Sequence, residues 1–197
     1  MAGVDMRACG VVSSHRRVWA RNAGFTMVEL IVVIIITGVL GGIAASRFMD
    51  RGGFDVDGFA EQSRGMIRYA QKVAIAQNRP VYVRLDGQSL SLCLARAVSC
   101  PADQQVLAPS GSNSGREATV TACKSNSWMC EGMPPGVTYE LSPIGTFSGN
   151  DAFFYFDALG RPHDASDSDD FVGLAITIKG GADTATVTVS PETGYVE

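Results

Sequence analysis

Gly24-Phe25-Thr26-Met27-Val28-Glu29-Leu30 is the stretch that decides the fold of this chain, and it runs directly into the apolar segment 31–36. No charged residue occurs from Leu30 to Ser46, so Glu29 is a single acid at the start of a long uncharged run. As a helix, residues 25–46 would rise about 33 Å at 1.5 Å per residue, enough to cross the hydrocarbon core of a bilayer. The pattern therefore predicts a membrane helix, and a carboxylate within such a helix requires a specific reason.

The residues ahead of the apolar run form a basic leader. Residues 1–24 contain four arginines and one acid, Asp5, and they end at the small-residue junction Ala23-Gly24. An ordinary secretory signal has its cleavage site after its apolar core, whereas this junction precedes the core. Cleavage here would leave the apolar helix on the mature protein. The positive charge of the leader also predicts that it stays in the cytoplasm while the C-terminal part is sent outward.

The segment 24–30 resembles the class III signal of type IV prepilins and type II secretion pseudopilins. In that family a dedicated peptidase cuts after the glycine, the new terminal phenylalanine is N-methylated, and the glutamate in fifth place of the mature chain guides assembly. The resemblance implies cleavage between Gly24 and Phe25, N-methylation of Phe25 and an assembly role for Glu29. We expect the carboxylate of a neighbouring subunit to neutralise the α-ammonium of Phe25, since truncating one member of a buried pair costs roughly 3 to 5 kcal/mol.

Length and charge bound the rest of the molecule. The chain has 197 residues, 46% of them apolar, which is enough for one membrane helix and one compact domain. Removal of the leader leaves 12 basic against 19 acidic residues, a balance that disfavours nucleic acid as a partner. We expect four segments: the leader 1–24, a transmembrane and assembly helix 25–48, its amphipathic continuation 49–79, and an extracytoplasmic globular β domain 80–197.

The pattern beyond the apolar run predicts an α+β fold. Apolar residues recur at mostly three-residue to four-residue steps from Phe54 to Asn78, which is typical of an amphipathic helix, and Pro80 ends this pattern. Strands are expected at 81–85, 90–94, 118–123, 137–141, 152–157, 171–178 and 184–189, with a hairpin turn at Asp86-Gly87 and a long loop over 101–115. A long N-terminal helix that covers one face of an antiparallel sheet also matches the pilin fold, as the resemblance implies.

Four cysteines remain after the leader: Cys93, Cys100, Cys123 and Cys130. An even number in an extracytoplasmic domain predicts two disulfides. Six residues separate each neighbouring pair, which suggests Cys93–Cys100 and Cys123–Cys130, although four cysteines permit three connectivities. A zinc site is the competing interpretation, but zinc modules of four cysteines use shorter gaps.

A second resemblance covers most of the globular domain. Phe153-Phe154-Tyr155-Phe156-Asp157-Ala158-Leu159-Gly160-Arg161-Pro162 resembles the F-x-x-x-G-R strand and turn of the subgroup that contains pseudopilin H and the minor pilin called fimbrial protein T. The passage from Ala70 to Leu85 and the closing Thr193-Gly194-Tyr195 also fit. This resemblance implies a minor subunit. The four cysteines and the class of leader suggest, by resemblance alone, a pilus of the mannose-sensitive haemagglutinin type.

The sequence gives little sign of catalysis, so we expect no enzymatic activity and no cofactor. His163 is the sole histidine of the mature chain, and neither a nucleophile elbow nor a phosphate-cradling glycine loop occurs. The acidic run from Asp164 to Asp170 is the best alternative site, since clustered oxygen ligands suit calcium. It lacks the central glycine and distal glutamate of an EF-hand, so we expect a solvated turn and no metal.

Two binding functions are alternatives to the assembly role. Some relatives in the fimbrial protein T group bind DNA through basic residues near the C-terminus, but after Arg161 this chain has one basic residue, Lys179, against seven acids. Trp128, Tyr139 and the aromatic run 153–156 suggest a sugar-binding face, yet aromatic residues that alternate along a strand usually belong to a core.

We therefore predict a minor type IV pilin, a structural subunit that takes part in pilus assembly or initiation. Its expected partners are prepilin peptidase and N-methyltransferase, other major and minor pilin subunits, and the inner-membrane assembly platform. Its expected location is the inner membrane, with the globular domain in the periplasm, and then the extracellular pilus or a periplasmic pseudopilus. A type II secretion pseudopilin is the alternative, and a membrane-anchored ligand-binding module is a further one.

Overall fold

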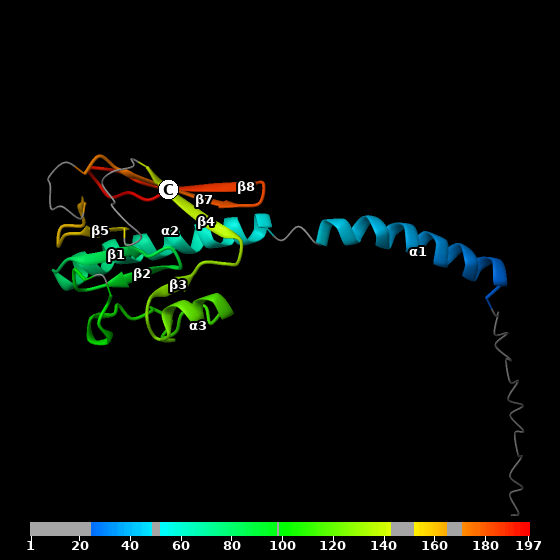
Figure 1. Ribbon diagram of the computed structural model, residues 1–197, viewed down its shortest axis with the longest axis horizontal. Helices are drawn as coiled ribbons and strands as arrows, with labels where there is room; N and C mark the ends of the chain where they lie inside the picture. The colour runs from blue at the N-terminus through cyan, green and yellow to red at the C-terminus, as the bar shows by residue number, and fades with distance from the viewer. Residues whose placement is uncertain (1–24, 49–51, 98, 143–151, 165–170) are drawn as a thin grey trace, which may run out of the picture. The chain divides into compact units, whose positions relative to one another are not determined.

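A computed structural model describes residues 25–48, 52–97, 99–142, 152–164 and 171–197 of the chain (Figure 1). The chain divides into two compact units, Met1–Arg47 and Phe48–Glu197. The first contains helix α1, Met27–Phe48, apart from its last residue, and the second contains helix α2, Gly52–Gln77, together with the described strands. Residues 49–51 lie outside the described residues, so a continuous helix through this point stays a prediction.

Thr26 directly precedes helix α1, and its Oγ1 accepts a hydrogen bond from the backbone N–H of Glu29 at 3.2 Å. This is an N-cap, because it satisfies one of the backbone N–H groups that the first helical turn leaves free. The described side chains from Phe25 to Gly42 are all exposed, and most are large and apolar. Within the part of the chain that the structure describes, no helix is both long enough and apolar enough to cross a membrane.

Helix α2 is amphipathic, as its sequence pattern predicts. Its buried side chains follow the three-residue to four-residue repeat of a helix face and are Val56, Phe59, Ala60, Ser63, Met66, Ile67, Ala70, Val73 and Ala74. Asn78 directly follows the last helical residue, Gln77, and adopts a left-handed conformation with φ of 50°. The Arg79 N–H then donates to the Ala74 carbonyl at 3.2 Å. Pro80 follows at once and prevents a further turn.

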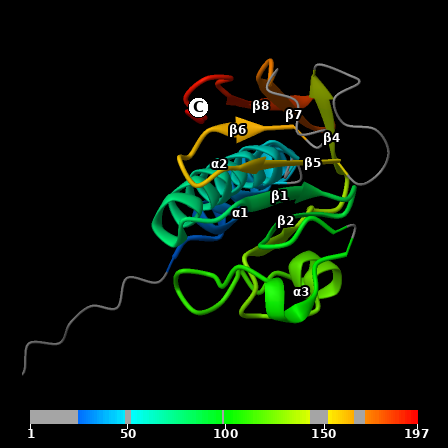
Figure 2. The same ribbon diagram turned by 90° about the vertical axis from the view of Figure 1, so that its left-hand side faces the viewer.

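Two antiparallel sheets contact α2, rather than the single sheet predicted. The first has the order β3-β2-β1-β5-β6, and the second has the order β4-β7-β8. Figures 1 and 2 show α2 running alongside strands of both sheets. The strands are β1 Val81–Leu85, β2 Ser89–Cys93, β3 Cys130–Gly132, β4 Val137–Ser142, β5 Ala152–Phe156, β6 Pro162–His163, β7 Leu174–Gly180 and β8 Asp183–Val189.

The expected α+β class is confirmed, and so is the β1–β2 hairpin. Strand β1 pairs with β2 and with β5, and the Asp86 carboxylate accepts hydrogen bonds from the backbone N–H groups of Gln88 and Ser89 in the turn. Alternate residues of the strands face α2 and form one apolar core that includes Val83, Phe154 and Ile178. Burial of this shared core joins the helix and both sheets into one domain.

The strand predicted at 118–123 is wrong, because this segment forms helix α3, Glu117–Cys123. Its alternating threonine and valine residues favour a strand by propensity. In the structure Thr119 and Cys123 are both buried, and their four-residue spacing places them on one helical face toward β3. Tertiary contacts therefore override local propensity here. A short 3₁₀ helix, Ala102–Gln104, lies within the segment predicted as a long loop.

Candidate functional site

The candidate assembly site lies at the start of α1. Gly24 is outside the described residues, and Phe25 is 82% exposed. Glu29 is in the first helical turn, where a negative charge is favoured by the free backbone N–H groups. Thr26 and Glu29 have the spacing of a capping box, in which the threonine caps the glutamate's N–H and the glutamate side chain returns to the threonine's N–H.

Only half of that capping box is formed. The Glu29 N–H donates to Thr26, but within the described residues the Glu29 carboxylate accepts no hydrogen bond and forms no ion pair. The acid is thus a single exposed anion on a helix whose described surface is otherwise almost wholly apolar. Chemically, this arrangement offers a carboxylate to a cation, and removing one member of such a pair is strongly destabilising once the pair is buried.

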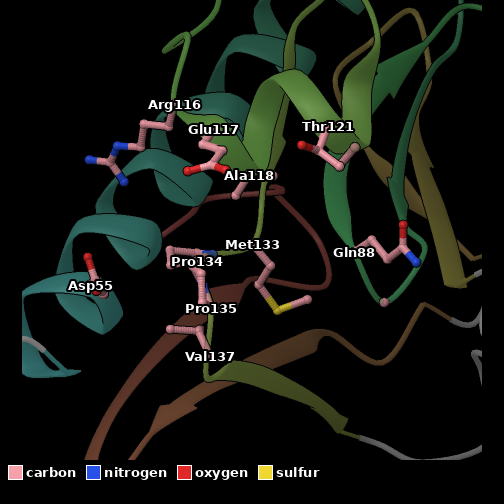
Figure 3. A pocket seen from close by; sticks show the side chains of 13 residues that line it. Asp55, Gln88, Arg116, Glu117, Ala118, Thr121, Met133, Pro134, Pro135 and Val137 are labelled. Atoms are coloured by element: carbon pink, nitrogen blue, oxygen red, sulfur yellow. The ribbon is translucent and has the colours of Figure 1, made fainter.

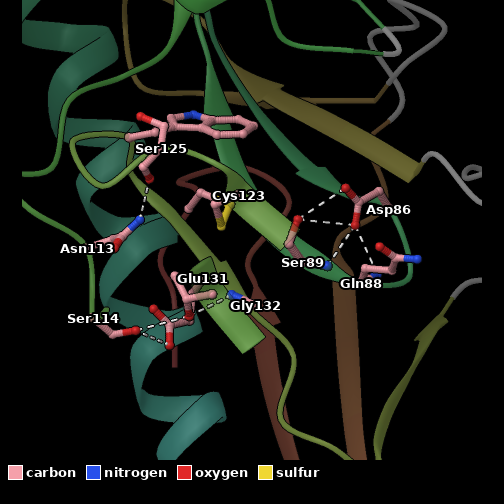
Figure 4. The surroundings of a disulfide bond; sticks show 12 residues. Asp86, Gln88, Ser89, Asn113, Ser114, Cys123, Ser125, Glu131 and Gly132 are labelled. Atoms are coloured by element: carbon pink, nitrogen blue, oxygen red, sulfur yellow. Dashed lines mark hydrogen bonds between the residues drawn. A yellow bond between two sulfur atoms is a disulfide. The ribbon is translucent and has the colours of Figure 1, made fainter. Parts of the chain in front are cut away.

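The four cysteines of the globular domain form two disulfides, Cys93–Cys100 and Cys123–Cys130. These are the nearest-neighbour pairs that the spacing suggested. The second disulfide joins the end of α3 to the start of β3 (Figure 4). Trp128 packs beside it and donates its indole N–H to the Leu92 carbonyl at 2.7 Å. Trp128 is therefore a core residue and not part of a sugar-binding face.

The F-x-x-x-G-R segment forms the end of β5 and a tight turn around Asp157. One carboxylate oxygen of Asp157 accepts hydrogen bonds from the backbone N–H groups of Leu159 and Arg161 at 2.9 and 2.8 Å. The other oxygen pairs with the Arg161 guanidinium at 2.9 Å and lies 3.3 Å from His163 Nε2. Partial burial raises the pKa of Asp157, but the hydrogen bonds from Arg161, His163 and Leu159 outweigh it, so the pKa lies below its ordinary value.

This turn is tied to α2 and to the C-terminal segment by Gln71. The Gln71 side-chain amide donates to the carbonyls of Gly160 and Thr193, each at 2.8 Å. Gly160 and Gly194 both adopt positive φ, and an added Cβ would lie 2.7 Å from Ile75 Cδ1 at Gly160 and 2.7 Å from Phe156 at Gly194. The two motifs that the sequence singled out are therefore neighbours in space. Their link through Gln71 carries no sequence signature.

His163 lies on β6, and its side chain is only 16% exposed. Its ring stacks on Tyr155 with centroids 5.0 Å apart. Asp164 is buried, and residues 165–170 of the acidic run lie outside the described residues. Among the residues that the structure does describe, there is no cluster of three or more His, Cys, Asp or Glu side chains able to hold a metal.

Sequence reasoning missed the buried acid Glu131 on β3. Its Oε1 accepts a hydrogen bond from Ser114 Oγ at 2.8 Å (Figure 4). Its Oε2 has no hydrogen-bond partner among the residues that the structure describes. No strand was predicted at Cys130–Gly132, and the side chain of Glu131 is buried in the structure, where β3 pairs with β2 and contacts α3.

Comparison with known proteins identifies the N-terminal segment. Residues 19–45 match the family described as "Prokaryotic N-terminal methylation motif". No curated protein sequence matches the chain.

Among solved structures, the chain is similar to the type IV minor pilin FimU of Pseudomonas aeruginosa, with 16% identity, a TM-score of 0.44, and coverage of 76% of this chain and 90% of that one. It is also similar to the minor pseudopilin EpsH of the Vibrio cholerae type II secretion system, with 12% identity, a TM-score of 0.45, and coverage of 74% and 93%.

Proposed function

We propose that this chain, which carries the N-terminal methylation motif of type IV prepilins and pseudopilins, is a minor structural subunit of a type IV pilus. The observation that carries the proposal is the start of α1, where one unpaired carboxylate, Glu29, lies at the head of an exposed apolar helix. Such a helix is stabilised when it packs against other apolar helices, because its apolar surface is then removed from water. The proposal assigns the protein no catalytic role.

Processing supplies the partner that Glu29 lacks. Cleavage between Gly24 and Phe25 creates an α-ammonium about four residues, or roughly 6 Å of helix rise, from the Glu29 carboxylate. When subunits pack through α1, the ammonium of one subunit and the carboxylate of its neighbour neutralise each other. Because either group alone is costly to bury, only the register that pairs them is stable. Methylation of Phe25 would leave the positive charge in place.

Before assembly, the proposal places α1 in the inner membrane, with the basic leader on the cytoplasmic side and the disulfide-bonded domain in the periplasm. The peptidase that removes the leader, the assembly platform and the other pilin subunits are the proposed partners. The Asp157 turn supports a minor subunit through its resemblance to the pseudopilin H and fimbrial protein T subgroup. A type II secretion pseudopilin has the same N-terminal motif and is the second candidate.

Quantitative mass spectrometry of filaments sheared from the native cell surface tests the proposal. The expected result is an N-methylated peptide that begins at Phe25, present at a low ratio to the major subunit. A Gly24→Leu variant, which removes the small residue of the junction, is the control for processing. Processed protein that stays in the inner membrane and is missing from surface filaments would favour the pseudopilin. An unprocessed N-terminus would contradict both candidates.

A further inference from the structure

A hollow of about 550 Å³ lies between the first turns of α2, helix α3 and the segment that follows β3 (Figure 3). Its floor is apolar and includes Met133, Pro134 and Val137. Its lining includes no residue of the N-terminal assembly site or of the Asp157 turn. An apolar hollow with a few converging polar groups is the usual form of a binding site.

Charged side chains stand on two walls of this hollow. Asp55 comes from α2, while Arg116 and Glu117 come from the start of α3 (Figure 3). In the part of the chain that the structure describes, none of these three side chains has a hydrogen-bond or ion-pair partner. Two carboxylates against one guanidinium give the hollow a net negative charge, so it favours a ligand that brings a cation.

The α3 wall is fixed in position by β3. The Cys123–Cys130 disulfide joins the two elements, and the Gly132 N–H donates to Thr119 Oγ1 at 3.1 Å (Figure 4). Gly132 approaches α3 so closely that an added Cβ would lie 2.3 Å from the backbone of Ala118. A wall held in this way does not need to be ordered when a partner binds, which favours affinity.

We infer that this hollow receives a peptide segment of a neighbouring filament subunit. The segment's apolar side chains rest on the floor of Met133, Pro134 and Val137, and its lysine or arginine lies between Asp55 and Glu117. The inference rests on the proposed function, because assembly through α1 is what brings a second subunit against this domain. Charge complementarity selects the segment, since an acidic one would be repelled by both carboxylates.

Photo-crosslinking from two adjacent positions of α3 tests the inference. Thr121 lines the hollow, whereas Val120 is 50% exposed on the same helix and does not line it. Benzoylphenylalanine is placed at one position or the other in the full chain, produced in the native cell, and irradiated filaments are analysed by mass spectrometry. We expect Thr121 to give a crosslink to another filament subunit, through a peptide that contains lysine or arginine, and Val120 to give none to that peptide.

A charge control sharpens the test. We expect Asp55→Asn to lower the Thr121 crosslink yield by about 1.4-fold to fivefold, the range for one partly exposed ion pair. The matched variant Asp57→Asn removes an exposed acid of the same helix that does not line the hollow, and it should leave the yield unchanged.

The outcomes separate the inference from the proposed function. Filaments that contain the protein but show no Thr121 crosslink, or equal crosslinks from both positions, would overturn the inference alone. A crosslinked peptide without a basic residue, or one from a protein outside the filament, would overturn it as well. If the protein is missing from filaments altogether, the proposed function fails and the inference falls with it.

Discussion

Replacement of Gly160 by alanine should destabilise the domain through two effects, the cost of a left-handed backbone conformation and the cost of overpacking against Ile75. Gly160 has a φ of +81°, and a Cβ there would lie 2.7 Å from Ile75 Cδ1. The left-handed conformation costs an L-residue about 1 to 2 kcal/mol, and overpacking adds about 1 to 3 kcal/mol. Because Ile75 is 52% exposed and its end can move, we take the lower overpacking value. The expected loss is about 2 to 3 kcal/mol in the free energy of unfolding.

Gly87 provides a matched control for this prediction. It has the same φ of +81°, and an added Cβ would meet no atom of the described residues within 4 Å. Gly87→Ala should therefore lose only the conformational part, about 1 to 2 kcal/mol. Combining Gly160→Ala with Ile75→Ala should recover about 1 kcal/mol relative to the sum of the two single changes, because the contact that causes overpacking is gone.

Urea unfolding of the mature chain in detergent, with both disulfides intact, measures these differences through the midpoint and slope of the transition. The measurement is informative because the two glycines differ in their surroundings and not in φ. Equal losses for Gly160→Ala and Gly87→Ala would refute the packing argument. The packing argument would also be refuted if Gly160→Ala lowered the free energy of unfolding by the same amount in the presence of Ile75→Ala as in its absence.

Three further predictions follow from the same structure. Glu29→Ala should be processed normally but enter filaments poorly, because it leaves a buried ammonium unpaired at a cost of roughly 3 to 5 kcal/mol. Immunoblots of sheared filaments measure how much of the variant is incorporated. Normal incorporation would count against the pairing. The difference in free energy of unfolding between the unchanged protein and Asp157→Asn should be largest above about pH 5 and shrink as the pH falls below about 4. The pKa of Asp157 is lowered in the folded state, so protonation at low pH removes the stabilisation that its carboxylate provides. A difference in urea midpoint that does not change with pH would contradict this prediction. Gly132→Ala should lower the free energy of unfolding by at least about 3 kcal/mol, because its Cβ would collide with backbone rather than with a movable side chain. Thermal unfolding is the check, and Gly65→Ala is the control because a Cβ there meets no atom of the described residues within 4 Å.

The parts of the fold that depend on local pattern were predictable from the sequence. The repeat from Phe54 onward places the buried face of α2, and Asp86-Gly87 places the first hairpin turn. Both features depend on the periodicity of burial and on turn chemistry within a few residues. The start of the apolar helix is of the same kind, because Thr26 and Glu29 are three positions apart.

The parts that depend on distant contacts were not predictable. Helix α3 has the composition of a strand, and it is helical because Thr119 and Cys123 face β3 together. The division into two sheets is set by which strands pair, and a sequence pattern of alternation does not specify the partner. The Gln71 link between the Asp157 turn and the C-terminal segment joins residues 89 and 122 positions apart, so no local signal could reveal it.

The two disulfides also bear on how the protein would mature in its proposed function, which puts the globular domain outside the cytoplasm. Each joins cysteines seven positions apart, and the first pair precedes the second in the chain. In the proposed function, the chain crosses the membrane from its anchored N-terminal end, so Cys93 and Cys100 arrive before Cys123 appears. Short loops close rapidly, so oxidation in the order of arrival gives both native bonds. Maturation should therefore depend on an oxidant and need little help from an isomerase, because the nearest available partner is in each case the correct one.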